Sequence, residues 1–317
     1  MINQVVEYLK GLEGKTLVLT HHNADIDAGA SAISLKLGLE KLGKEVDIGV
    51  AESVSRAARG FCGKYKFIVD PDCSKFDNVI LVDTSVPEQL SSVGNLRADC
   101  VIDHHPKGKL VGELAWVDET KKSAAQMVYE VLKKLEVDVD HELAKIIACG
   151  IVGDTAHLRL AEKEEFSILV ELLHTGVTYS EILKSLESKI EVSERVACLK
   201  ACTRADVYRN GEVIVVISKV VSFEAAACRA LLRSGADVAV VIANKKDQMR
   251  VSSRGNYRLK GKIDLSEIFA GVGKIIGGSG GGHDLAGSAN GKDRKEKEVR
   301  DFLIVELSKR FGKLERI

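Results

Sequence analysis

In this 317-residue chain, three residues are well suited to chemistry: one histidine and two aspartates with the spacing H-x3-D-x-D. They are His21, Asp25 and Asp27. They come directly after an apolar, β-branched run at 16–20 and shortly before a helical pattern at 31–42, so a strand leads into a helix there. Carboxylates held this close repel one another unless a cation lies between them. Imidazole and carboxylate ligands suit Mn²⁺, Mg²⁺, Zn²⁺ or Fe²⁺. The alternative interpretation is an acidic turn that only caps the following helix.

Three further polar clusters follow apolar runs or a helical pattern later in the chain. They are Asp83 after the run at 78–82, Asp103, His104 and His105 after the run at 100–102, and Asp154 beside glycines after a helical pattern. In an open parallel α/β sheet, ligands bind outside the carboxyl ends of the strands, so residues at these positions converge although they are distant in sequence. The recurrence therefore favours a shared cation site over four unrelated turns.

These four segments resemble the motifs of the DHH phosphoesterase superfamily, which is named for the triplet seen here at 103–105. Residues 280–287, Gly-Gly-Gly-His-Asp-Leu-Ala-Gly, resemble the G-G-G-H-x-x-A-G signature of the substrate-binding domain associated with one DHH branch. That branch holds RecJ-like exonucleases, nanoRNases of the oligoribonuclease/pAp-phosphatase type and cyclic-dinucleotide phosphodiesterases. All five motifs occur in family order, and the resemblance covers nearly the whole chain.

The resemblance implies a role for each polar residue of the first half. Two divalent ions are expected, most simply Mn²⁺, with Mg²⁺ or Co²⁺ as alternatives. One ion would be held by His21, Asp25 and Asp83, and the other by Asp27, Asp83, His104 and Asp154. Asp103 would orient a ligand or a bound water, and His105 would face the substrate phosphate as a donor or proton carrier. A histidine that only fills space beside the metals is the alternative for His105.

In the second half, the resemblance implies substrate contacts from a strand and a glycine-rich loop. The residues are Arg254 and Ser253 of the strand, with Arg250 as an alternative arginine, and Gly280, Gly281, Gly282 and His283 of the loop. Consecutive glycines let a backbone approach a phosphate or base closely. Seven basic residues and one acidic residue lie between 245 and 262, and this stretch could also bind a phosphate. A solvated β-hairpin is the alternative for this basic stretch.

Alternating strand and helix patterns must position the first set of residues. Strands are expected at 16–20, 46–50, 66–69, 78–82 and 99–102, and helices at 31–42, 122–135, 141–149 and 163–174. This alternation predicts an α/β fold with a doubly wound, mostly parallel sheet covered by helices on both faces.

A charged helical stretch at 181–204 would connect this sheet to a smaller α/β domain with a mixed sheet. That domain begins with a strand-turn-strand pattern whose turn is Asn210-Gly211. We expect a DHH metal-binding catalytic domain at 1–185, a helical linker at 186–205 and a DHH-associated substrate-binding domain at 206–317.

Composition narrows the classes of function. A formal net charge of zero excludes a global positive field that would gather long nucleic acids. The longest apolar runs are shorter than the ~18–20 residues of a membrane span, and the first residues do not resemble a signal peptide, which predicts a cytoplasmic protein without membrane contact.

We therefore expect a phosphoesterase resembling the nanoRNases, acting on short single-stranded oligonucleotides or small nucleotides such as pAp. A RecJ-like exonuclease would ordinarily need a longer chain with an OB-type domain and a basic groove. A stand-alone cyclic-dinucleotide phosphodiesterase and a non-catalytic scaffold are two further candidates. Inorganic pyrophosphatase activity is disfavoured because DHH pyrophosphatases carry a different C-terminal domain. Whether the chain forms a homodimer is left open.

Overall fold

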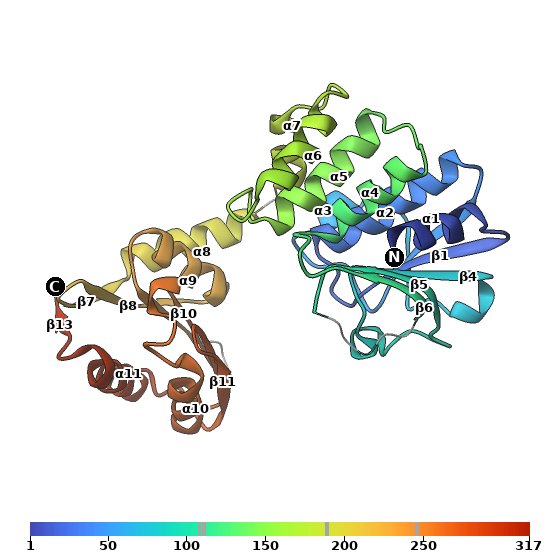
Figure 1. Ribbon diagram of the computed structural model, residues 1–317. Helices are drawn as coiled ribbons and strands as arrows, with labels where there is room; N and C mark the ends of the chain where they lie inside the picture. The colour runs from blue at the N-terminus through green and yellow to red at the C-terminus, as the bar shows by residue number, and fades with distance from the viewer. Residues whose placement is uncertain (107–108, 110–111, 188–189, 245–246) are drawn as a thin grey trace. The chain divides into compact units, whose positions relative to one another are not determined.

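The structure is a computed structural model that describes residues 1–317 except 107–108, 110–111, 188–189 and 245–246. The chain divides into two compact units, Met1–Lys189 and Ile190–Ile317 (Figure 1). Each unit is built around its own β-sheet. Helix α8 (Val192–Thr203), which falls in the expected linker, packs against strand β8 (Val213–Val220) and helix α9 (Glu224–Arg233) of the second unit. The expected three-part division stays a prediction.

The first unit contains a six-stranded parallel sheet in the order β3-β2-β1-β4-β5-β6. The strands are β1 (Lys15–Thr20), β2 (Glu45–Val50), β3 (Phe67–Val69), β4 (Asn78–Val82), β5 (Ala98–Asp103) and β6 (Gly112–Val117). The α/β fold class is confirmed, although the sequence patterns did not indicate β6. The direction of strand order reverses between β1 and β4, and such a switch point is where ligands bind in open α/β sheets.

Helices cover one face of this sheet among the described residues. They are α1 (Ile2–Lys10), α2 (Ile26–Lys41), α3 (Arg59–Cys62), α4 (Ala124–Lys134), α5 (His141–Asp154), α6 (Lys163–Leu173) and α7 (Tyr179–Leu186). Helix α5 packs against α2 and α4, and Gly150 permits this approach, because a Cβ there would lie 2.4 Å from Ala125 Cβ. The close packing brings the end of α5 to the carboxyl end of the sheet.

The opposite face differs from the expected cover of α-helices. It is covered by the short 3₁₀ segments η1 (Cys73–Lys75) and η2 (Pro87–Leu90), whose Cys73 and Leu90 are buried with Leu17 and Leu81 of the sheet. A second difference concerns the single helix expected at 181–204, because α7 ends at Leu186 and α8 begins only at Val192.

The second unit contains a mixed seven-stranded sheet in the order β11-β12-β10-β9-β8-β7-β13. Its remaining strands are β7 (Asp206–Asn210), β9 (Val238–Asn244), β10 (Met249–Gly255), β11 (Gly278–His283), β12 (Ala286–Gly291) and β13 (Glu315–Arg316). Among the described strands of this sheet, the β8–β9 pair is parallel and the others are antiparallel. The β7–β8 hairpin confirms the turn predicted at Asn210-Gly211, where Gly211 has a φ of 55°.

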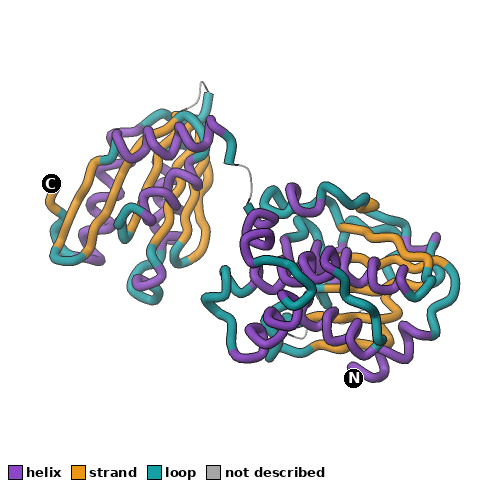
Figure 2. The backbone as a smooth tube through the Cα atoms, turned by 90° about the horizontal axis from the view of Figure 1, so that it is seen from above, coloured by secondary structure: helices purple, strands orange, loops and turns teal. Residues whose placement is uncertain are grey.

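Two helix pairs cover this second sheet, whose strands lie side by side in Figure 2. Helices α10 (Leu265–Ile275) and α11 (Glu296–Phe311) share one apolar core with Val251 of β10. Helices α8 and α9 form a second core with Val241 of β9 on the other face. Across the ranges that the structure describes, no helix combines the length and the apolar character of a membrane span.

Candidate metal centre and polar face

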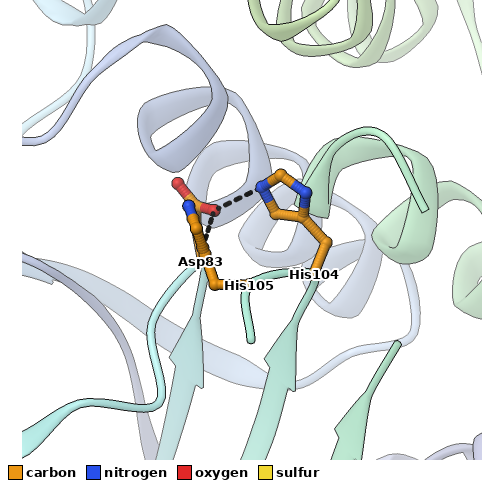
Figure 3. A group of neighbouring side chains, drawn as sticks. All are labelled: Asp83, His104 and His105. Carbon is orange, nitrogen blue, oxygen red and sulfur yellow. Dashed lines mark ion pairs between the residues drawn. The ribbon is translucent and has the colours of Figure 1, made fainter. Parts of the chain in front are cut away.

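The predicted metal ligands of the first unit gather at the carboxyl ends of β1, β4 and β5. Three groups have ligand atoms within 4.8 Å of one another: His21, Asp25 and Asp83; Asp27, His104 and Asp154; and Asp83, His104 and His105. Asp83 and His104 each belong to two groups, so the groups form one continuous centre. Figure 3 shows Asp83 at the end of β4, with its carboxylate turned towards His104 and His105 from the end of β5.

Asp83 lies at the middle of this centre and is only 2% exposed. Its Oδ2 lies 3.4 Å from His21 Nε2, and its Oδ1 lies 3.3 Å from His104 Nε2. The backbone of Asp83 has a φ of 60°, which is uncommon for a residue other than glycine. Strained backbone of this kind concentrates at functional sites, and here it turns the carboxylate across the end of the sheet.

The two histidines next to Asp83 are oriented by backbone carbonyls. His21 Nδ1 lies 2.8 Å from the carbonyl oxygen of His22, and His104 Nδ1 lies 3.4 Å from that of Lys121. Because a carbonyl can only accept, each Nδ1 carries a proton. Nε2, which faces the carboxylates, is therefore the ring atom that would bind an ion once its own proton has left. Metal-binding histidines are commonly oriented by such a bond on the other ring nitrogen.

Helix starts position two of the aspartates. Asp25 Oδ1 accepts a hydrogen bond of 3.1 Å from the Ala28 amide, so Asp25 caps α2 as well as joining the centre. Asp27 is buried, and its two oxygens accept from the Ala124 amide at 2.6 Å and the Ala125 amide at 3.0 Å, at the start of α4. The capping interpretation and the cation-site interpretation of the H-x3-D-x-D segment are therefore compatible, because a carboxylate oxygen has two lone pairs.

Burial and like charge shape the pKa values of the carboxyl groups. Burial, together with the charges of Asp83 and Asp154, raises the pKa of Asp27 well above its usual value. Burial likewise raises the pKa of Asp154 to about 6. For Asp83 burial acts in the same direction, but the close contacts with His104 and His21 outweigh it and lower the pKa.

The pKa of His104 responds to the same charges. Burial alone would lower it, but the contact with Asp83 and the charges of Asp27 and Asp154 raise it to about 9. The carboxylates thus favour the protonated, positively charged form of His104. The buried Asp83 Oδ1 and Asp103 Oδ2 also have no hydrogen-bond partner among the described residues. This nitrogen and oxygen donor set fits divalent cations of the Mn²⁺ or Mg²⁺ type, and no thiol belongs to it.

Asp103 and His105 form a pair beside the centre. Asp103 is fully buried, and its Oδ1 accepts from the His105 amide at 3.1 Å and lies 2.9 Å from His105 Nδ1. The bond to Asp103 raises the pKa of His105. Nδ1 therefore donates to Asp103, while the side chain of His105 is 52% exposed. This geometry favours a proton-donating role over metal binding through Nδ1.

Gln89 of η2 is a part of the site that sequence reasoning missed. Its backbone oxygen accepts from the His22 amide at 3.0 Å and lies 3.0 Å from His22 Nδ1. Its Oε1 accepts from Thr84 Oγ1 at 2.6 Å. Gln89 thus joins the loops that follow β1 and β4 and holds His22 away from the ligand groups. No sequence signal marks it, because a single glutamine in a short turn has no distinctive spacing.

The predicted substrate-binding residues of the second unit lie on three neighbouring strands, β10, β12 and β11. Opposed residues of antiparallel strands share a face of the sheet. The face turned away from α10 carries Arg250, Ser252 and Arg254 of β10, Ala286, Ser288 and Asn290 of β12, and Ser279, Gly281 and His283 of β11. These nine residues are called the polar face below. Each of them is exposed or half-buried.

The glycine motif forms the edge strand β11 and not the expected loop. A Cβ on Gly280 would lie 2.0 Å from the Phe269 oxygen of α10, and one on Gly282 would lie 1.9 Å from the Ala286 oxygen, whereas one on Gly281 meets no atom within 4 Å. Gly280 and Gly282 are therefore required by packing. Of the three glycines, Gly281 belongs to the polar face, and packing accounts for glycine at 280 and 282 without a substrate contact.

Ser253 and Arg254, although adjacent, lie on opposite faces of β10. Ser253 is fully buried, and its Oγ accepts from the Gly287 amide at 3.0 Å and donates to the Gly287 oxygen at 3.3 Å. This placement gives Ser253 a structural role and argues against direct substrate contact. Arg254 is half-buried on the polar face, where Arg254 and His283 pair with Ala286 from either side. Lys245 and Lys246 of the basic stretch lie outside the described residues.

Two family models match the chain, the DHH family N-terminal domain over residues 15–151 and the DHHA1 domain over residues 214–309. The chain therefore belongs to the DHH family of phosphoesterases. It is 32% identical over 314 residues to the uncharacterized protein MJ0988 of Methanocaldococcus jannaschii, and the match covers 95% of this chain and 94% of that protein.

A second relative and a solved structure extend this comparison. The bifunctional oligoribonuclease and PAP phosphatase NrnA of Thermus thermophilus is 32% identical over 187 residues, which cover 58% of this chain and 57% of NrnA. The crystal structure of an exopolyphosphatase-related protein from Bacteroides fragilis aligns with a TM-score of 0.70 at 16% identity, covering 97% of this chain and 95% of that one. At that identity the structural likeness shows the fold alone.

Proposed function

We propose that this chain is a metal-dependent phosphoesterase that hydrolyses short single-stranded oligonucleotides or small nucleotides such as pAp. The observation that carries the proposal is the sharing of Asp83 and His104 among three groups of ligand atoms at one edge of the sheet. The relative named as an oligoribonuclease and PAP phosphatase favours this substrate class.

Two divalent ions, in this proposal Mn²⁺ with Mg²⁺ or Co²⁺ as alternatives, would supply a water-derived nucleophile at neutral pH and neutralise charge on the phosphoryl group. His21, Asp25 and Asp83 are the ligands proposed for one ion, and Asp27, Asp83, His104 and Asp154 those proposed for the other. The two oxygens of the Asp83 carboxylate support a bridging role, because Oδ2 lies near His21 and Oδ1 lies near His104.

His105 is the proposed catalytic proton donor. Its Nδ1 proton is held by Asp103, so its half-exposed ring can donate from Nε2 to a phosphoryl oxygen or to the leaving group. Asp103 acts through His105 by fixing the ring and stabilising the charged imidazolium. In the second unit, Arg254, His283 and the open backbone at Gly281 are the proposed substrate contacts.

The test is a comparison of initial rates on a substrate panel with Mn²⁺, and with EDTA as the control. The panel contains 5′-labelled dinucleotides to tetranucleotides, longer single strands, pAp and cyclic dinucleotides. The proposal expects the highest kcat/KM on the short oligonucleotides or on pAp. A clear preference for long single strands would point to a RecJ-like exonuclease instead. If metal binds but none of the substrates is hydrolysed, the proposal is wrong and a scaffold is favoured.

A further inference from the structure

The polar face carries two arginines on the same strand, Arg250 and Arg254 of β10. They are four residues apart, so their Cα atoms are separated by roughly 13 Å at the usual rise of about 3.3 Å per residue. Both belong to the face turned away from α10, because strand residues two or four apart point to the same side. The face therefore has two separate positions for a guanidinium group.

Contacts with the sheet hold these guanidinium groups apart. Arg250 Nε donates to Asn290 Oδ1 at 2.9 Å, which directs the side chain across to β12. Arg254 Nη1 donates to the backbone oxygen of Ser253 at 2.7 Å. Each guanidinium has five N–H donors, so each keeps donors for an anion after these bonds are made. Because their Cα atoms are roughly 13 Å apart and each side chain is bonded to a different residue, we expect them to meet two phosphates and not one.

Small polar residues occupy the row between the arginines. Ser252 of β10 pairs with Ser288 of β12, which pairs with Gly281 of β11. A Cβ on Gly281 would meet no atom within 4 Å, so the row is open above β11. At its β10 end, Ser252 is half-buried, and Cys228 of α9 donates to its backbone oxygen at 3.2 Å. The nine residues of the polar face include no acidic side chain, and Asp284 of the adjoining turn accepts a bond from the Leu285 amide. Nothing in this row would repel a phosphodiester chain.

We propose that Arg250 is a second phosphate contact, which meets an oligonucleotide that runs along β10 from Arg254. The inference rests on the proposed function and names its substrate class more narrowly, as oligonucleotides of three or more nucleotides. Such a ligand meets both arginines, since Arg binds phosphate well through paired N–H donors. A mononucleotide such as pAp meets only the Arg254 position, so Arg250 determines preference by length.

Binding in EDTA tests this inference without turnover. The affinity of a 3′-fluorescein-labelled, 5′-phosphorylated tetranucleotide is measured by fluorescence anisotropy, and that of pAp by competition with it. For Arg250→Gln we expect the Kd of the tetranucleotide to rise about five- to tenfold, while the Kd of pAp changes less than twofold. Arg250→Lys should recover part of the loss, and Asn290→Ala, which frees the Arg250 side chain, should give a smaller loss.

The matched control is Lys297→Gln, which removes one positive charge from the same unit. Lys297 is exposed on α11, whose core residues pack with Val251 on the opposite side of the sheet. It should leave both affinities unchanged. An unchanged tetranucleotide Kd in Arg250→Gln, an equal loss for pAp, or no binding of either ligand by the wild-type chain would overturn the inference. Absence of hydrolysis in Mn²⁺ with length-dependent binding intact would overturn the proposed function alone.

Discussion

The two units gather polar residues in different ways. In the first unit, side chains from strand ends and helix ends point at one place, and backbone groups fix several of them. In the second unit, the polar residues stand in rows, spaced by strand register, on a sheet face that α9 also contacts at β10. Convergence at a sheet edge suits a compact, highly charged ligand such as an ion. A face with strands about 4.8 Å apart suits an extended ligand instead.

The largest expected effect comes from removing the shared carboxylate of the convergent centre. Asp83→Asn keeps the shape and tolerates the left-handed backbone, but it removes the negative charge that both ligand groups use. We expect turnover to fall about 10³-fold or more, because each 1.4 kcal/mol of lost transition-state stabilisation costs roughly tenfold. Activity assays with Mn²⁺ and calorimetric Mn²⁺ binding measure this. Asp138→Asn, at an exposed site, is the matched control, and near-normal activity of Asp83→Asn would remove Asp83 from the site.

A smaller loss is expected from changing Asp103, which is proposed to act through His105. Asp103→Asn should lower kcat about 10²-fold with little change in Mn²⁺ affinity, because the neutral amide no longer stabilises the charged imidazolium of His105. The pH profile of kcat should shift, since the carboxylate raises the pKa of His105. Equal losses in kcat and in Mn²⁺ affinity would instead indicate that Asp103 serves the ions themselves.

Metal affinity should depend on pH because ions and protons compete for the same groups. His104 has a pKa of about 9, so below pH 9 an ion must displace a proton from its imidazole. Asp154 has a pKa of about 6, so below pH 6 the ion must also displace a proton from that carboxyl group. Affinity for Mn²⁺ should therefore rise with pH, by up to about tenfold per unit between pH 7 and 9. Titration calorimetry in buffers of different ionisation enthalpy would count the released protons. An affinity that is flat across this range would contradict the assignment.

The smallest expected effects come from β11, where Gly280 is packed against α10 and Gly281 faces open space. Gly280→Ala should lower the free energy of unfolding by about 2 kcal/mol, because its methyl group would overlap the Phe269 backbone oxygen. Gly281→Ala should change it by less than about 0.5 kcal/mol, because the added carbon meets open space. Thermal unfolding of the pair measures the difference. If both variants are equally stable, α10 does not pack on β11 as described.

The sequence predicted the proximity of residues that stand at the ends of regular elements, whereas their binding of metal stays a prediction. The fold class could be predicted from alternating patterns, and the six predicted ligands lie together because each stands at the end of a strand or near the end of a helix. Gln89 could not be predicted, since its role depends on two loops that meet only in the folded chain.

The second unit was harder to predict because glycines hide its regular elements. Helix α10 contains Gly271 and Gly273, which disfavour a helix by propensity. Strand β11 is rich in glycines, which disfavour a strand. The structure supplies the reason, because a Cβ on Gly273 would lie 2.4 Å from the Gly280 nitrogen. Each element tolerates its glycines because the other packs directly on its backbone, and such a mutual requirement is not visible in either segment alone.

Asp27 links the metal centre to the architecture of the first unit. Its two oxygens accept the amides that open α4, and α4 in turn contacts α1, α2, α5 and β5. If Asp27 binds an ion as proposed, a chelator should therefore destabilise the packing of α4 as well as abolish activity. The melting temperature of the first unit should rise with the fraction of sites that hold an ion. Thermal unfolding would then report the occupancy of the centre.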